Sequence, residues 1–330
     1  MTFESPFVSV IVVNWNGMPY LEECVRSLLR LSYTNFEIIV VDNNSSDNSV
    51  DLLKQLSPKL TLIINEENLG FARGCNIGIK ASKGDFIALF NNDAVADPEW
   101  LTELVTSLSR LKDAGAAGGP VYYCDQPTKI WFSGGRIDVL TGFSWNIGQN
   151  QSSFRLEGSD VDTLTGCAIL IKRDLLAKIG YLDEGYFLYG EDHDLSTSIK
   201  RLRKDLIFVP TAIAWHKVSA SKKKAPLFAY NMKTKSDLRF ILKNYPLKFL
   251  ASALIFRGFF FPLSEMVYFY KDPLYLLNAT KSMASNLRHL KLTIQERKRV
   301  QQLGKVMIRN RFKEFVMEAS KRIREGKLYW

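Results

Sequence analysis

The sequence predicts an α/β fold with a mostly parallel central sheet and flanking helices, followed by a basic, amphipathic helical region. Short apolar segments rich in Val and Ile alternate with segments whose apolar residues recur at helical spacing, as in consecutive βαβ units. Polar residues follow the short apolar segments. Charge is divided unevenly, because residues 1–216 hold 27 acidic and 19 basic side chains whereas residues 217–330 hold 7 and 25. A basic surface that binds a partner is therefore expected in the last third of the chain.

The composition of the 330-residue chain, with 46% hydrophobic and 24% charged residues, is that of a folded protein, and its length predicts about two domains. No repeat or low-complexity tract is visible, which excludes fibrous and solenoid classes. The four cysteines are widely separated and predict neither a zinc finger nor a disulfide framework. We expect reduced thiols in a cytosolic protein, and the N-terminal residues lack the basic region of a signal peptide.

The first hundred residues are predicted to form short strands and helices in alternation. The expected strands are 8–13, 36–41, 60–64 and 86–90. Helices are expected at 20–31, 72–81 and 98–112. A further helix is expected to begin at a cap formed by Ser45, Ser46 or Asp47 and to end at residue 56. Ligands of open α/β sheets bind beyond the carboxyl ends of the strands. Polar residues at these ends should therefore line one cleft; they are Asn14, Asp42, Asn44, Asn68 and Asp93.

The middle of the chain is less regular in pattern. Residues 118–162 are rich in Gly, aromatic and polar residues and are expected to form irregular structure over the cleft, with strand-like pieces at 129–132 and 142–145. A buried strand is expected at 164–171 and a last core strand at 207–215. Helices are expected at 173–179 and 191–204.

The C-terminal region changes in character after residue 216. Residues 227–245 predict a basic helix, and residues 249–270 are the most apolar stretch of the chain. Arg257 and Glu265 interrupt that stretch, and Gly258 and Pro262 weaken it as one helix. Its uninterrupted apolar pieces are shorter than the roughly 20 residues that span a bilayer. We therefore expect it to be interfacial rather than transmembrane, with packing on the preceding α/β part of the chain or on a second subunit as the alternative. The basic, helical tail from Arg288 is typical of a helix on an anionic membrane surface.

Three groups of polar residues could carry chemistry. Asp93 follows an apolar strand beside Asn91 and Asn92 and has the hard oxygen donors that a divalent cation prefers, although an acidic turn after a strand is also ordinary. Such a cation would allow an acidic cleft to bind a phosphate-rich ligand. His216 follows the last expected strand, where a hydrogen-bonded loop residue is the competing interpretation.

The acidic group Glu191, Asp192 and Asp194 stands at an expected helix start, where capping explains one or two of the carboxylates. The aromatic run before it could raise the pKa of a carboxylate toward a value suited to proton abstraction. Gly70 would let the backbone approach a ligand closely, or would simply serve a turn.

Six motifs, in this order, resemble the inverting family 2 glycosyltransferases, especially their rhamnosyltransferase-like branch, over about residues 7–220. The motifs are VSVIVVNWN (8–16), VVDNNSSD (40–47), NLGFA (68–72) with Asn76 and Gly78, FNND (90–93), YGEDHDL (189–195) and WH (215–216), with Gly166, Gly180 and Asp183-Glu184 between them. The resemblance implies a GT-A fold, with a nucleotide-binding half at 1–117 and an acceptor-binding half at 118–220. Residues 221–330 lie beyond the resemblance, and their basic and apolar pattern predicts a helical, membrane-associating region.

The resemblance also implies a role for each matched residue. Asp192 would be the catalytic base, and Asp93 and His216 would bind Mg²⁺ or Mn²⁺. The nucleotide-sugar site would comprise Asn14, Asp42, Asn44, Asn68, Gly70, Asn76, Asn91 and Asn92, and the supporting residues on the acceptor side would be Gly166 and Glu191. The chain departs from the family pattern in having Asn91 in place of the first aspartate of the metal motif, and no glycine shortly after His216.

The implied function is metal-dependent, inverting transfer of a sugar, with rhamnose as one candidate. The donor would be a dTDP-, UDP- or GDP-sugar and the acceptor a glycan or polyprenyl-linked glycan for cell-surface polysaccharide synthesis, at the cytoplasmic face of an anionic membrane. A sugar-nucleotide-making nucleotidyltransferase is an alternative, but residues 14–20 lack its glycine-rich loop and lysine. A nucleic-acid-binding protein has only the net charge of +10 in its favour. A catalytically inactive membrane scaffold would not need Asp93 and Asp192.

Overall fold

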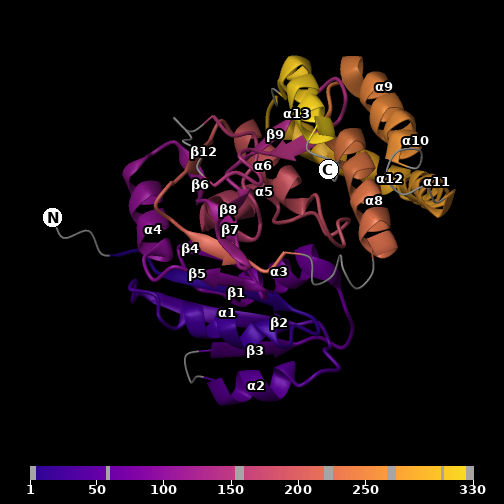
Figure 1. The fold of residues 1–330 in the computed structure, drawn as a ribbon. Helices are drawn as coiled ribbons and strands as arrows, with labels where there is room; N and C mark the ends of the chain where they lie inside the picture. The colour runs from indigo at the N-terminus through magenta and orange to yellow at the C-terminus, as the bar shows by residue number, and fades with distance from the viewer. Residues whose placement is uncertain are drawn as a thin grey trace.

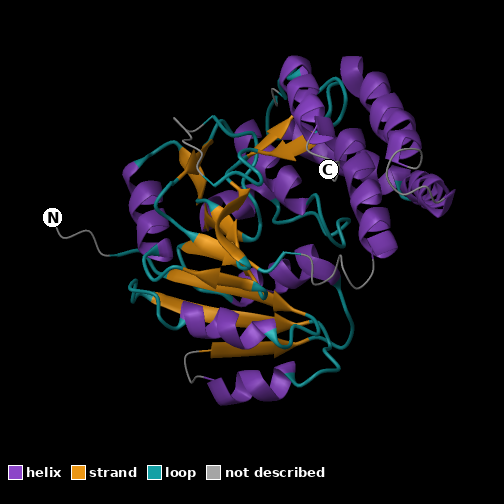
Figure 2. Cartoon of the chain, viewed as in Figure 1, coloured by secondary structure: helices purple, strands orange, loops and turns teal. Residues whose placement is uncertain are grey.

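The computed structural model describes residues 5–56, 60–152, 160–218, 226–265, 273–305 and 308–324. Its centre is a seven-stranded sheet in the order β12-β6-β11-β4-β1-β2-β3 (Figures 1 and 2). Four of these strands are parallel neighbours: β1 (Val8–Asn14), β2 (Phe36–Asp42), β3 (Leu60–Ile64) and β4 (Phe86–Asn91). The predicted α/β fold with a mostly parallel sheet is therefore confirmed.

Helices cover both faces of this sheet, which explains why all seven residues of β1 are buried. Val8, Val10 and Val12 pack in one core with α1 (Tyr20–Leu28) and α4 (Trp100–Arg110). The alternate residues Ile11 and Val13 pack in a second core, with α3 (Gly70–Ala81), α5 (Arg173–Ile179) and α6 (Glu191–Arg201). Helix α2 (Ser49–Leu56) lies beside β3.

Strand β6 (Ala114–Gly118) was not predicted, because a run of Ala and Gly has little preference for a strand. The packing around it explains these small residues. A β-carbon on Gly115 would lie only 2.6 Å from Cγ2 of Ile199 on α6. β6 pairs antiparallel with β11 (Ala168–Lys172), which is also antiparallel to β4. The sheet thus changes direction at β11.

The single strand expected at 207–215 is wrong. The structure has β12 (Asp205–Phe208) in the large sheet and β13 (Ala214–His216) in a second, four-stranded sheet of order β5-β13-β7-β8. Pro210 separates the two strands, since it cannot donate to a sheet ladder. β5 (Ala94–Ala96) pairs antiparallel with β13 and brings His216 opposite Ala94.

Residues 118–162 contain more regular structure than the sequence predicted. β7 (Val121–Tyr123) and β8 (Gln126–Phe132) complete the second sheet, and β9 (Gly135–Ile137) forms a hairpin with β10 (Ser144–Asn146). The strands are short and irregular in register, which explains why their sequence pattern is weak.

The C-terminal region is helical, as expected, and gathers on one side of the molecule (Figure 1). Its helices are α8 (Pro226–Asn244), α9 (Leu247–Ile255), the π-helical turn η1 (Phe256–Phe260), α10 (Phe261–Glu265), α11 (Pro273–Arg288), α12 (Leu290–Gln302) and α13 (Phe312–Arg324). Among the residues that the structure describes, no helix is both long enough and apolar enough to cross a bilayer.

The structure describes the apolar stretch 249–270 as far as residue 265, and its last residues lie outside the described part. Some side chains of the described part are packed and others are exposed. Ala253 is buried, and the ring of Phe261 meets that of Phe143 edge-on with centroids 4.5 Å apart. Phe259 and Phe260 are more than half exposed, at 59% and 53%. Part of the stretch therefore packs against residue Phe143 of the preceding part of the chain, and the side chains of Phe259 and Phe260 are left uncovered.

Candidate active site

Three of the predicted site residues meet at the carboxyl ends of β1, β2 and β4. The register of the sheet sets Asn14 beside Asp42, and Nδ2 of Asn14 donates to Oδ1 of Asp42 at 2.8 Å. Nδ2 of Asn92, just beyond β4, donates to Oδ1 of Asn14 at 2.8 Å. Asn14 and Asp42 are fully buried. The two side chains are therefore joined and buried at the strand ends where the sequence predicted a cleft, and Asn92 is bonded to them through Asn14.

The turn after β2 is built from side-chain hydrogen bonds. The carboxylate of Asp42 accepts from the backbone N–H of Ser45 at 2.8 Å and from its hydroxyl at 2.7 Å. Asn44 has a positive φ of 59°, is exposed, and donates to the carbonyl oxygen of Glu66 at 2.9 Å. Asn43, which the sequence analysis did not select, is buried and donates to the carbonyl of Gly70 at 3.0 Å.

The start of α3 requires a glycine. Gly70 has a φ of +78°, and a β-carbon there would lie 2.5 Å from the carbonyl oxygen of Phe187. Its N–H donates to Oδ1 of Asn68 at 3.0 Å, and the next N–H, of Phe71, donates to the carbonyl of Phe187 at 2.8 Å. Further along α3, Asn76 bonds both the N–H and the carbonyl of Leu182, at 3.0 and 2.9 Å. α3 thus holds the segment that leads to α6.

Asp93 and His216 form a pair at the edge of the cleft. Nε2 of His216 lies 2.9 Å from Oδ1 of Asp93, and the ring of Trp131 stands edge-on to the imidazole at 4.5 Å between centroids. Burial raises the pKa of Asp93, but His216 outweighs that effect and holds the pKa below its ordinary value. The two residues predicted to bind a metal are therefore adjacent, and Trp131 is a neighbour that the sequence did not indicate.

Asp192 lies in the first turn of α6, after Gly190 with its φ of +84°. Its Oδ1 accepts from the N–H of His193 at 2.8 Å, and its Oδ2 accepts a long hydrogen bond of 3.4 Å from the N–H of Gly166. The side chain remains 22% exposed. Asp192 therefore keeps an oxygen that an incoming group could reach.

Cys167 shows that the two halves of the predicted site converge. Burial raises the pKa of its thiol, His216 opposes this, and the charges of Asp93 and Asp192 raise the pKa further. Backbone hydrogen bonds give the geometry: the carbonyl of Cys167 accepts from the N–H of Asn91 at 2.9 Å, and the N–H of Gly166 donates to Oδ2 of Asp192 at 3.4 Å. Residues 166 and 167 therefore join the turn that carries Asp192 to the end of β4, which leads to Asp93.

Glu191 differs from its neighbour Asp192. Burial, with a smaller contribution from the charge of Asp192, raises the pKa of Glu191 to about 8. One of its oxygens is buried without a hydrogen-bond partner among the described residues. Burial and the neighbouring negative charge therefore favour the protonated, neutral form of Glu191. Tyr189, which the sequence analysis did not assign to the site, has its pKa raised to about 12 by burial and by the negative charges of Glu191 and Asp93.

A separate cavity of about 690 Å³ lies between α12 and the segment 180–187. Its lining includes Asn76, Asp183 and Arg239 but, among the described residues, not Asp93, Asp192 or His216. We assign the chemistry to the region of Asp93, His216 and Asp192 instead, because backbone hydrogen bonds of residues 166 and 167 link Asp192 to the end of β4.

Comparisons with known proteins agree with this geometry. Residues 9–180 match the family model for glycosyl transferase family 2. An uncharacterized glycosyltransferase of Haemophilus influenzae is 34% identical over 116 residues, which are 34% of this chain and 36% of that protein. An N-acetylglucosaminyl-diphospho-decaprenol L-rhamnosyltransferase of Mycobacterium tuberculosis is 27% identical over 241 residues, 66% of this chain and 78% of that protein.

Two solved structures have the same fold. The mannosyltransferase PcManGT from Pyrobaculum calidifontis, in complex with GDP-Man and Mn²⁺, has a TM-score of 0.56 at 16% identity and covers 92% of this chain and 86% of its own. Residues 1–349 of S. aureus TarS give a TM-score of 0.54 at 17% identity, with coverages of 98% and 93%. The family match spans more than half of the chain and the fold is that of GT-A glycosyltransferases, and the chain therefore belongs to glycosyl transferase family 2.

Proposed function

We propose that this protein transfers a sugar from a nucleoside-diphosphate donor to an acceptor hydroxyl in a single displacement that inverts the anomeric carbon. The observation that carries the proposal is that residues 166 and 167 link the two carboxylates, because the carbonyl of Cys167 bonds the N–H of Asn91 near Asp93 and the N–H of Gly166 bonds Asp192. The partly exposed carboxylate of Asp192 can accept a proton, while that of Asp93 faces a histidine at a spacing suited to a metal.

The donor nucleotide is assigned to the strand ends at Asn14, Asp42 and Asn92, because ligands of open α/β sheets bind there. The turn around Asn44, Asn68 and Gly70 borders that position. The mycobacterial relative is named as a rhamnosyltransferase acting on a diphospho-decaprenol. We propose by analogy a deoxyhexose or hexose donor, with rhamnose as the first candidate, and a polyprenyl-linked glycan acceptor.

The residues present fit a divalent cation. In an octahedral Mg²⁺ site, ligands about 2.1 Å from the ion stand about 3 Å from each other when adjacent, and Oδ1 of Asp93 and Nε2 of His216 are 2.9 Å apart. Among the described residues no third His, Cys, Asp or Glu joins them, which leaves positions for phosphate oxygens and water. When bound, Mg²⁺ or Mn²⁺ would neutralise charge on the leaving diphosphate.

The residues of the chain then have distinct roles. Asp192 removes the proton of the acceptor hydroxyl while the hydroxyl oxygen attacks the anomeric carbon. The bond between that carbon and the nucleoside diphosphate breaks in the same step. Glu191, in its protonated form, adds no second negative charge beside Asp192 and so does not repel the donor. Gly166, whose N–H points to Asp192, holds one oxygen of the base.

We also propose that the C-terminal helices hold the protein on the cytoplasmic face of an anionic membrane, where a polyprenyl-linked acceptor would lie. Large apolar side chains are exposed along α9 to α11, which stand together at the edge of the molecule in Figure 1. They are Ile255, Phe259, Phe260, Leu263, Leu274 and Leu277. Lys248, Lys281 and Arg288 are exposed on the same helices, and this combination is typical of an interfacial membrane surface.

A donor panel tests the proposed function. The full-length protein is incubated with dTDP-rhamnose, UDP- and GDP-sugars, Mn²⁺ and a short-chain polyprenyl-diphosphate glycan, and the product is analysed for its anomeric configuration. We expect one donor to give a product of inverted configuration together with a free nucleoside diphosphate. Retention of configuration, or release of pyrophosphate from a nucleoside triphosphate and a sugar phosphate, would contradict the proposal.

A further inference from the structure

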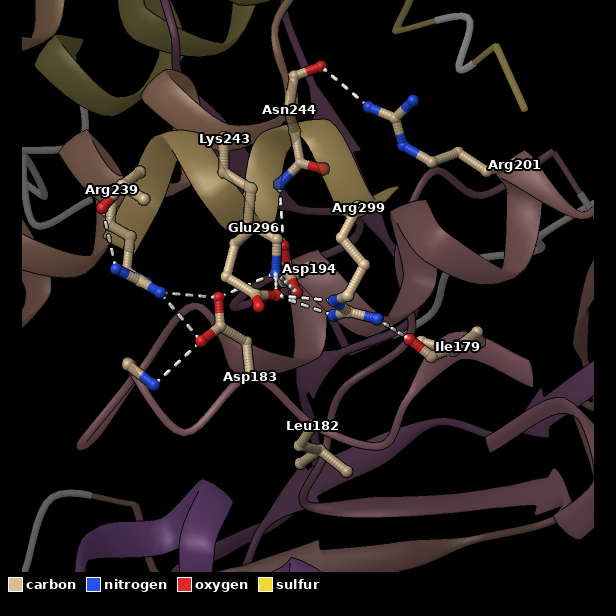
Figure 3. Close-up of polar contacts among 12 residues, drawn as sticks. Ile179, Leu182, Asp183, Asp194, Arg201, Arg239, Lys243, Asn244, Glu296 and Arg299 are labelled. Carbon is tan, nitrogen blue, oxygen red and sulfur yellow. Dashed lines mark hydrogen bonds and ion pairs between the residues drawn. The ribbon is translucent and has the colours of Figure 1, made fainter. Parts of the chain in front are cut away.

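One face of α8 is bonded to the segment that carries Asp192. Ser236, Arg239, Lys243 and Asn244 have the spacing i, i+3, i+7 and i+8, which puts them on the same side of a helix. Figure 3 shows Arg239, Lys243 and Asn244 directed at Asp183 and Asp194, the two carboxylates on either side of the catalytic turn.

The contacts run along the segment 183–194 in order. Nη2 of Arg239 donates to both oxygens of Asp183 at 2.9 Å, and the hydroxyl of Ser236 donates to the carbonyl of Leu188 at 3.1 Å. Nζ of Lys243 reaches Oδ2 of Asp183 at 2.7 Å and Oδ2 of Asp194 at 2.8 Å. Lys243 is therefore the one side chain among these that bonds both ends of the segment.

These groups are buried and charged. The side chain of Lys243 is 0% exposed, and those of Asp183 and Asp194 are 5% and 6% exposed. Burial lowers the pKa of Lys243, but the two aspartates outweigh that effect and raise it. Burial also opposes ionisation of Asp183, yet Lys243 and Arg239 hold its pKa at about 2. The ammonium group is thus permanently charged at neutral pH.

Such a cluster is a poor way to gain stability, because removing charges from water costs about as much as their attraction returns. It does fix geometry, since each carboxylate oxygen has a directed donor. Asp194 is bonded twice, by Lys243 and by Nδ2 of Asn244 at 2.7 Å. Asp194 lies in the same helical turn as Asp192, so the two bonds to its side chain anchor the turn whose backbone carries the base.

We propose that Lys243 is a positioning residue for catalysis, which fixes the orientation of Asp192 by tying both ends of the segment 183–194 to α8. The inference rests on the proposed function and deepens it. It makes the C-terminal helical region part of the active site's support. The family match ends at residue 180 and does not include this region.

The test compares turnover with stability in full-length variants. Lys243→Met removes the cation and leaves Asp194 without it, so we expect both a lower melting temperature and a kcat reduced by roughly 10²-fold, the effect of a displacement of about 1 Å. Donor affinity, measured with the nucleotide sugar that the donor panel selects, should stay within about threefold. The double variant Lys243→Met/Asp194→Asn removes the unpaired charge, so the melting temperature should recover while kcat stays low.

A matched control is available on the same helix. Asp237 is buried on α8 and is paired with Lys233 and Arg257, away from the segment 183–194. Asp237→Asn should lower the melting temperature and leave kcat within about threefold of the wild-type value. If Lys243→Met does not fold, kcat and the melting temperature are compared between Asp194→Asn, the double variant and the wild type instead.

Two results would overturn the inference. One is a kcat that recovers together with the melting temperature in the double variant, and the other is an equal loss of kcat in Asp237→Asn. Both require an active wild-type enzyme. A wild-type protein that transfers no sugar from any donor would instead overturn the proposed function, so the two failures are distinguishable.

Discussion

Nε2 of His216 lies 2.9 Å from Oδ1 of Asp93, although 123 positions separate the two residues in the chain. The pairing of β5 with β13 brings them together, since His216 stands opposite Ala94, the residue after Asp93. The backbone N–H of Lys217 donates to the carbonyl of Asp93 at 3.0 Å and extends the contact. The pair therefore depends on the small second sheet rather than on the large one.

Replacing Asp93 by Ala is expected to abolish Mn²⁺-dependent donor binding, because no neighbouring carboxylate can replace its oxygen. His216→Ala should weaken the same binding less, since an imidazole contributes no negative charge. Isothermal titration calorimetry with and without Mn²⁺ measures both. Asp113→Ala, which removes an exposed carboxylate paired with Lys204, is the control. Unchanged Mn²⁺-dependent affinity in Asp93→Ala would show that the metal assignment is wrong.

Asp192→Asn should bind the donor almost normally and lose turnover by roughly 10²-fold or more, because the amide keeps the shape but cannot accept the proton. Steady-state kinetics and donor titration separate the two effects. The exposed carboxylate of Asp174 supplies the control variant Asp174→Asn. A turnover number of Asp192→Asn near that of the wild type would rule out the role of base.

Glu191→Gln is expected to change the pH dependence of stability. A glutamate in the unfolded chain titrates near 4.5 and Glu191 in the fold at about 8, so between these pH values the folded state binds more protons. The free energy of unfolding then falls as pH rises, by at most about 1.4 kcal/mol per pH unit. Glutamine cannot titrate and removes this slope.

Denaturant unfolding at pH 6, 7 and 8 measures that slope. The variant should gain stability relative to the wild type as pH rises through this range, and Glu22→Gln, at an exposed surface pair, should not. Parallel curves for Glu191→Gln and the wild type would mean that Glu191 is already ionised at pH 6.

The exposed apolar side chains of η1 are expected to contribute to membrane binding. The full-length protein should sediment with anionic liposomes, more weakly with neutral ones, and salt should release part of it. Phe259→Ser/Phe260→Ser should lower the affinity by at least tenfold, because two aromatic side chains no longer enter the lipid. Ile64→Ser, at an exposed apolar position on β3, is the control. Equal binding to neutral and anionic vesicles would contradict electrostatic docking.

The fold of the first half was predictable because its pattern is local. Alternation of apolar strands and amphipathic helices gave β1 to β4 within one residue at their ends. β6 was missed and β13 was misassigned because their residues depend on close packing and on strand partners far away in the chain. Gly115 on β6, which packs against Ile199, is an example. The local spacing of apolar residues does not reveal such distant contacts.

The site was predictable in part. The strand-end residues Asn14 and Asp42 followed from the sheet pattern, whereas the pairing of Asp93 with His216 was implied only by family resemblance. Lys243 was missed for a physical reason: in the sequence it is one lysine in a basic helix, which predicts a solvated face, and only the tertiary structure brings it to Asp183 and Asp194.

The ion pairs between residues 1–218 and the C-terminal helices restrict which helices could replace those of this protein in a chimera. The acidic first part and the basic last part neutralise each other where they touch, as Lys243 does with Asp194 and Arg311 with Asp162. A chimera that joins residues 1–218 to helices without these cations would leave buried carboxylates unpaired. We therefore expect such a chimera to fold only when the new helices carry basic side chains in the places of Lys243 and Arg311.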